Sequence, residues 1–258
     1  GQTYFLPAQG HINQPVQRPR QRLYHRPGDK PMASQEEEVD EEESFKEEVD
    51  RLIRRHRNEK YAPELLPYDK EMVHNISEVL HFVAEALEEY RSNGQAKDLP
   101  HHYLRSTEAE RLTYMLSDYL RLRLWKLSKY PLHYMDPQRQ MMLSSAERIW
   151  LHEFWDNKRM HFQHRFLAAL PEKKQALDEQ VDDNLDMIRR PQMDTHIYAR
   201  ICGDVGTISP SLHASPGVSS TPGTKDLRLF EGETYLIRYK EIRKFLVEPD
   251  HDGKVELV

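Results

Sequence analysis

"AERLTYMLSDYLRLRLWKL", residues 109–127, decides the fold that we expect for this chain. Successive residues of an α-helix are rotated by about 100°, which places most of the apolar side chains of this stretch within one broad arc. Arg123 falls near the centre of that arc, and Tyr114 and Trp125 share the opposite side. The pattern predicts a long helix with two apolar faces, one for a core and one for a central position in a bundle or for a partner. The arc contains Leu112, Met115, Leu116, Tyr119, Leu120, Leu122, Leu124 and Leu127.

Arg123 has two interpretations. Its guanidinium either passes its neighbours to reach water, or it pairs with a carboxylate within the bundle or on a partner, because an unpaired buried charge costs several kcal/mol. Arginine is the cation best suited to bidentate pairing with a carboxylate. The sequence leaves both interpretations open.

The composition favours a chain of long helices. Its 258 residues are 38% hydrophobic and 31% charged, enough for one or two domains. Only ten glycines argue against a glycine-rich nucleotide loop. The single Cys202 permits no intrachain disulfide, favours a reducing compartment, and is interpreted as a small core residue. No apolar run is long enough to span a membrane, so we expect no membrane partner.

The N-terminal region carries charge in blocks. Residues 1–31 are rich in arginine, whereas residues 36–43 contain seven acidic residues and no base. Such blocks repel internally and bury little surface, so residues 1–43 are predicted to form a disordered tail. Met32 begins a stretch typical of a translation start, and residues 1–31 are therefore interpreted either as an upstream extension or as residues foreign to the native chain.

A helical domain is predicted over residues 44–190. Ser44 and Glu47 form a capping-box pattern before the first helix, and Asp69 can cap the second. Short connections favour an antiparallel bundle of about four to five helices. The expected helices cover residues 44–58, 69–91, 100–130 and 144–170, the last capped by Ser144 or Ser145.

A small β-rich domain is predicted over residues 191–258. Residues 195–203 alternate between apolar and other side chains, which is typical of a strand. Residues 203–225 are rich in Gly, Ser, Pro and Thr and are expected to be a mobile insertion. The following stretches "DLRLF" and "TYLIRY" suggest a hairpin, before a short helix "KEIRKFL" and a last strand "KVELV". A domain of this size is not very stable without support.

The chain contains no recognisable catalytic set. His161 and His164 lie near His152 and Glu153, but without the spacing of a zinc-binding H-E-x-x-H motif. The Ser-nucleophile, P-loop and calcium-loop motifs are also absent. We therefore expect a protein that is not an enzyme and has no metal, no cofactor and no small-molecule substrate.

Nucleic-acid binding is the alternative function. Arg51, Arg54, Arg55 and Arg57 crowd one short helical stretch. They also follow the acidic run directly, so they can pair with carboxylates instead of phosphates. A helical nucleic-acid-binding protein acting through these four arginines remains a second hypothesis.

Three separated motifs carry a resemblance to a known family. "NEKYAPELL" at residues 58–66, the opening stretch at 109–127 and "GETYLIRYKEIRKFL" at 232–246 together resemble the Sld-five subunits of the eukaryotic GINS complex. The resemblance covers residues 44–258 apart from the 203–225 insertion, and the Arg/Pro-rich head has no counterpart in the family.

The resemblance implies a function. GINS is a heterotetramer in which Sld-five subunits carry a helical A domain followed by a small β-rich B domain. The family implies a non-enzymatic scaffold of the replicative helicase in the nucleus, acting at replication initiation and fork progression. The implied partners are three sibling GINS subunits, the minichromosome-maintenance helicase ring and its accessory factor, with DNA contacted only indirectly.

The resemblance also implies a set of subunit-interface residues, which lie on or just beneath the contacting surfaces. They are Tyr114, Tyr119, Arg121, Arg123 and Trp125 in the helical domain, with Leu236, Arg238 and Tyr239 in the β-rich domain.

Overall fold

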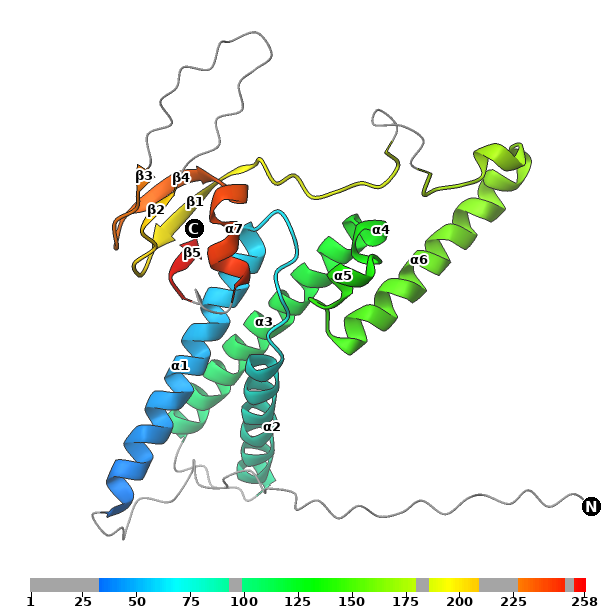
Figure 1. Cartoon of the computed structure of the whole chain (residues 1–258). Coiled ribbons are helices and arrows are strands. Elements are labelled where there is room, and N and C mark those ends of the chain that lie inside the picture. Colours follow the sequence, from blue (N-terminus) through cyan, green and yellow to red (C-terminus); the bar gives the residue numbers. More distant parts are fainter. Residues whose placement is uncertain (1–32, 93–98, 180–185, 209–226, 249–252) are drawn as a thin grey trace, which may run out of the picture. The chain divides into compact units, whose positions relative to one another are not determined.

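The protein is mainly helical and ends in a small sheet, which confirms the expected fold class (Figure 1). The computed structural model describes residues 33–92, 99–179, 186–208, 227–248 and 253–258. The chain divides into two compact units, residues 1–46 and residues 47–258. None of the described helices is long and apolar enough to cross a bilayer.

Helix α1 spans Ala33–Tyr61, so it begins well before the predicted start at Ser44. Ser44 lies inside the helix, so the predicted helix start at this residue is wrong. The physical reason is that the glutamates of the acidic run are good helix formers, which allows the helix to continue through them. Residues 33–43, which were predicted to belong to a disordered tail, are part of α1, and residues 1–32 lie outside the described part of the chain.

Helices α2 (Lys70–Ser92) and α3 (Leu99–Lys129) lie side by side and agree with their predicted bounds (Figure 1). Asp69 caps α2 as expected, since its Oδ1 accepts a hydrogen bond of 3.2 Å from the Met72 backbone N–H. The same carboxylate accepts hydrogen bonds from Arg51 and Arg55 of α1. The Asp69 side chain thus caps α2 and also holds α1 beside it.

Two short helices that the sequence did not predict follow α3. They are α4 (Pro131–Tyr134) and α5 (Pro137–Gln140), each with proline in its first turn. Helix α6 spans Ser145–Arg165 and ends before the predicted Leu170; two 3₁₀ turns, Leu167–Ala169 and Glu172–Lys174, follow it.

Ser144 caps α6, and Glu147 completes a capping box with it. The Ser144 Oγ accepts a hydrogen bond of 3.2 Å from the Glu147 N–H, and Glu147 Oε2 accepts one of 2.8 Å from the Ser144 N–H. Ser144→Ala should lower the free energy of unfolding by about 1 kcal/mol, because one helix N–H loses its acceptor. Urea denaturation followed by circular dichroism measures this change. Ser145→Ala, at an exposed helix position, is the matched control and should leave stability unchanged.

The C-terminal sheet has the order β4-β1-β5 with antiparallel pairing. These strands are β1 (His196–Ile201), β4 (Thr234–Arg238) and β5 (Val255–Leu257). The alternation predicted for β1 is confirmed, because Ile197, Ala199 and Ile201 are all buried. Helix α7 (Tyr239–Val247) follows β4 and buries Ile242 and Phe245. We call β1–β5 with α7 the β-rich domain.

The predicted hairpin between "DLRLF" and "TYLIRY" is wrong. The first stretch contains β3 (Leu227–Arg228), which pairs with β2 (Thr207–Ile208), whereas β4 pairs with β1. Pairing with β1 places Ile237 directly opposite Ile197, so that both reach the core. A local hairpin would leave β1 without this partner. Strand β2 also lies within the predicted 203–225 insertion, of which residues 209–226 fall outside the described part of the chain.

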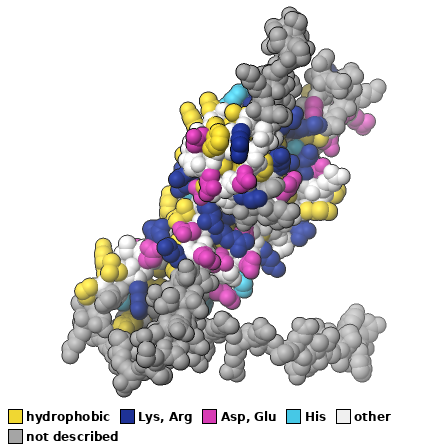
Figure 2. Space-filling model, turned by 60° about the vertical axis from the view of Figure 1, so that its left-hand side comes forward, with side chains coloured by type: hydrophobic (Ala, Val, Ile, Leu, Met, Phe, Trp, Pro, Cys, Tyr) yellow, Lys and Arg dark blue, Asp and Glu magenta, His cyan; other side chains and the backbone are white. Residues whose placement is uncertain are grey.

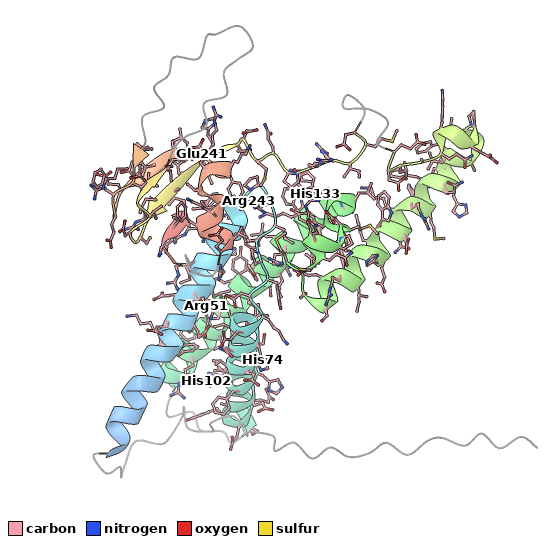
Figure 3. All side chains as sticks on the ribbon, in the orientation of Figure 1. Arg51, His74, His102, His133, Glu241 and Arg243 are labelled. Atoms are coloured by element: carbon pink, nitrogen blue, oxygen red, sulfur yellow. The ribbon has the colours of Figure 1, made fainter. Side chains whose placement is uncertain are left out.

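His133 of α4 is a buried, uncharged histidine (Figure 3). Burial, reinforced by Arg139 and Arg190, lowers the pKa of this imidazole from 6.5 to about 4. The His133 imidazole therefore binds a proton near pH 6.5 in the unfolded chain, whereas in the folded chain it binds one only near pH 4.

Stability should consequently fall as the pH drops through 6.5, by at most about 1.4 kcal/mol per pH unit from this group. His133→Gln should flatten that pH dependence between pH 7 and pH 5. Thermal unfolding at several pH values measures the slope, with the exposed His81→Gln as control. Equal slopes in the wild type and in His133→Gln would contradict the assignment.

Candidate subunit interface and buried charge network

Arg123 of α3 is fully buried, and its charge is neutralised inside the chain. Its Nε donates to Glu147 Oε1 at 2.6 Å and its Nη2 to Glu147 Oε2 at 3.2 Å, which makes a bidentate pair. Its Nη1 donates to Glu59 Oε2 at 3.1 Å. The guanidinium therefore joins α1, α3 and the first turn of α6.

The remaining surroundings of Arg123 are also matched to a guanidinium. Nη1 donates to the Leu66 carbonyl at 2.7 Å, and Nη2 donates to the Met142 carbonyl at 3.2 Å. The rings of Tyr68 and Tyr119 lie 5.3 Å and 5.6 Å from the guanidinium carbon, within the range of cation–π attraction. The interpretation in which Arg123 reaches water is wrong, and its carboxylate partners come from the same chain.

The charges of this cluster shift the pKa values of its members. Burial opposes the charge on Arg123, but Glu59, Tyr119 and Glu147 raise the pKa of its guanidinium above the ordinary value. Burial raises the pKa of the Tyr119 hydroxyl to about 12. Both groups therefore keep their usual protonation states at neutral pH.

Lys126 is a second buried cation that sequence reasoning missed. Its Nζ donates to Glu59 Oε1 and to the Glu64 carbonyl, each at 2.7 Å, and also to the Glu59 carbonyl. Burial lowers the pKa of this ammonium, while Glu59 opposes that shift. Lys126 lies three residues after Arg123 on the same helix face, which is the signal that could have revealed it. Glu59 and Glu64, in the quoted motif at residues 58–66, were also overlooked.

The expected interface residues of α3 divide into two groups. Tyr119 and Arg123 are buried within the chain, so they can act only from beneath a contacting surface. Tyr114, Arg121 and Trp125 are exposed. Their role in subunit contacts remains a prediction.

A line of exposed aromatic side chains runs along α3. Tyr103, Tyr114 and Trp125 are 71%, 66% and 56% exposed. They are spaced eleven residues apart, about three helical turns, so they drift by only about 20° around the helix. We call these three residues the aromatic stripe. Monomeric proteins seldom leave such a row uncovered, which marks this face as a candidate contact surface.

Helix α6 also leaves large apolar side chains uncovered. It contacts α3, α4 and the 3₁₀ turn at Leu167–Ala169. Ile149, Met160 and Phe166 are exposed on or just after α6. The helical domain therefore offers apolar surface on both α3 and α6.

The β-rich domain contributes a smaller apolar pair. Leu236 of β4 lies directly opposite Tyr198 of β1, and each is 57% exposed. Of the other expected interface residues, Tyr239 is buried and Arg238 is partly buried. Leu236 is thus the expected residue of this domain that is best placed to contact a partner.

Three of the four arginines of the nucleic-acid hypothesis form ion pairs with carboxylates of the same chain. Arg51 and Arg55 pair with Asp69, and Arg57 pairs with Glu256. On the face shown in Figure 2, cationic and anionic side chains are intermingled. Phosphate binding by this helix would require breaking ion pairs within the chain, so the arrangement does not favour this alternative.

Neither a nucleophile nor a metal centre emerges from the described residues. His, Cys, Asp and Glu side chains do not gather in groups of three or more that could hold a metal ion within those ranges. The interpretation of Cys202 as a core residue is wrong: it is exposed just beyond the end of β1. Although Cys202 is exposed, partial desolvation and Glu256 raise the pKa of its thiol, which disfavours the reactive thiolate.

Sequence comparisons identify the family. The chain is 30% identical over 217 residues to the DNA replication complex GINS protein SLD5 of Arabidopsis thaliana, covering 82% of this chain and 91% of that protein. It is 29% identical over 190 residues to sld5 of Schizosaccharomyces pombe, covering 73% and 83%, respectively. For human SLD5 the identity is 27% over 221 residues, covering 81% and 88%. No protein-family profile matches the chain.

The fold and the uncovered apolar faces are those of a helical protein suited to contacts with other chains. The chain belongs to the SLD5 family of DNA replication complex GINS proteins, which confirms the resemblance of its three motifs to Sld-five subunits.

Proposed function

We propose that this chain is a non-enzymatic structural subunit of a heterotetrameric GINS complex that works in DNA replication. Its relatives are named as DNA replication complex GINS proteins, and the alignment spans most of their length. The observation that carries the proposal is the aromatic stripe of α3, an apolar surface that is left uncovered by the rest of the described chain.

The wider role follows from the same proposal. Three sibling GINS subunits cover the apolar faces of α3 and α6 and the Leu236–Tyr198 pair. The assembled complex acts in the nucleus as a scaffold that joins the minichromosome-maintenance helicase ring and its accessory factor at initiation and fork progression. It contacts DNA only indirectly through these partners.

Co-expression with the three sibling subunits tests the proposal. The chain alone should aggregate or self-associate, because its apolar faces are exposed, whereas the co-expressed chain should elute as one monodisperse species with equal amounts of four subunits. Gel filtration with light scattering measures the mass of each species. If the chain instead folds cooperatively as a monomer and does not bind the sibling subunits, that result would count strongly against the proposal.

A further inference from the structure

The segment Asn58–Leu66, which runs from the end of α1 toward α2, contributes to the core of the β-rich domain. Ala62 and Leu66 are buried in one cluster with Ile201 of β1 and Ile242 of α7. These two side chains come from a part of the sequence far from the sheet. The β-rich domain therefore lacks part of its own core when this segment is removed.

Glu64 connects the same segment to α7. Its Oε1 accepts hydrogen bonds from the Tyr239 hydroxyl at 2.8 Å and from Arg243 Nε at 2.5 Å, and its Oε2 accepts one from Arg243 Nη2 at 3.2 Å. Figure 3 shows Arg243 on α7. Glu64 is itself buried, so this bidentate pair is shielded from water on the carboxylate side.

Asn58 accepts a hydrogen bond from the outer edge strand of the sheet. The Leu257 N–H of β5 points away from β1 and donates to Asn58 Oδ1 at 2.8 Å, in a buried hydrogen bond. Beside it, Arg57 pairs with Glu256 at 3.3 Å. Helix α1 thus closes the edge strand β5 with a side chain in place of another strand.

The segment is fixed from the other side by the buried charges of α3. Lys126 donates to the Glu64 carbonyl and to Glu59, and Glu59 in turn accepts from Arg123. A continuous row of polar contacts therefore runs from Arg243 of α7 to the Arg123–Glu147 pair at the start of α6. Residues 47–258 accordingly form a single compact unit.

We infer that residues 58–66 act as a latch that makes the helices and the β-rich domain one folding unit, with Glu64 as its central residue. The β-rich domain does not swing on the chain between α6 and β1, because its core and its edge strand are both completed by the latch. Partners therefore meet the aromatic stripe and the Leu236–Tyr198 pair in a fixed relative arrangement.

Hydrogen exchange of the full chain, in whichever assembly it purifies, tests the latch. Glu64→Ala should accelerate amide exchange in α7 and β5 by about tenfold or more, because it removes the acceptor of Tyr239 and Arg243 and leaves the buried Tyr239 hydroxyl unsatisfied. Exchange in α2, which contains none of the hydrogen-bond partners described for Glu64, should stay as in the wild type.

Arg243→Ala provides a second variant that keeps the buried side of the latch intact. This variant should accelerate amide exchange in α7 and β5 by a smaller factor than Glu64→Ala does. It still tests the inference if Glu64→Ala fails to fold. Glu231→Ala removes an exposed carboxylate of the same domain and is the matched control. Unchanged exchange of α7 and β5 in both latch variants would overturn the inference, as would equal acceleration throughout α2.

Discussion

Replacing Arg123 with leucine should lower the free energy of unfolding by about 3–5 kcal/mol, one of the largest losses that a single substitution can cause in this chain. The variant leaves Glu147 buried at the start of α6 without its bidentate partner. Glu59 is less affected, since Lys126 still donates to it at 2.7 Å. The leucine side chain also cannot satisfy the Leu66 carbonyl, which accepts from Arg123.

Urea denaturation of the chain, alone or in its complex, measures this loss. Arg148→Leu is the matched control, because it removes the same charge from an exposed position on α6 that is outside the expected interface set. Adding Glu147→Gln to Arg123→Leu should recover part of the stability, since the orphaned charge is then removed. If Arg123→Leu unfolds at the wild-type urea concentration, the ion pairs contribute little and the buried network has no structural role.

Local sequence patterns were sufficient to predict the elements whose capping residue or hydrophobic period lies within a few consecutive residues. The Asp69 and Ser144 caps and the alternation of β1 all depend on contacts within a few positions. The anomaly at Arg123 was also visible, because one charge interrupts an otherwise apolar arc. The shared side of Tyr114 and Trp125 followed from the same helical geometry, whereas their exposure needed the folded structure.

Long-range pairing could not be predicted in the same way. The partner of β4 is β1, across a segment that separates them in sequence, and local turn signals pointed to β3 instead. Glu64 looked like an ordinary loop carboxylate, since nothing near it in sequence reveals Arg243. Charged residues are usually exposed, so the burial of Lys126 contradicts the general rule and needs the folded network to explain it.

Exchanging both Tyr114 and Trp125 for arginine should abolish assembly while leaving the fold of the chain intact. The two side chains are exposed and belong to the aromatic stripe, so charges there cost the isolated chain little. On the proposed function they are covered by a sibling subunit, and two desolvated charges in that contact should weaken binding by about 100-fold or more.

Pull-down of the co-expressed sibling subunits, followed by titration of the purified parts, measures the loss of assembly. Thr113→Arg adds a charge to another exposed side of the same helix, so it separates an effect of the stripe from an effect of charge on α3. A matching far-ultraviolet circular dichroism spectrum would establish that the double variant keeps its helices. Normal assembly of the double variant would move the contact surface away from the stripe. The exposed apolar side chains Ile149, Met160 and Phe166, on or just after α6, would then be the next surface to change.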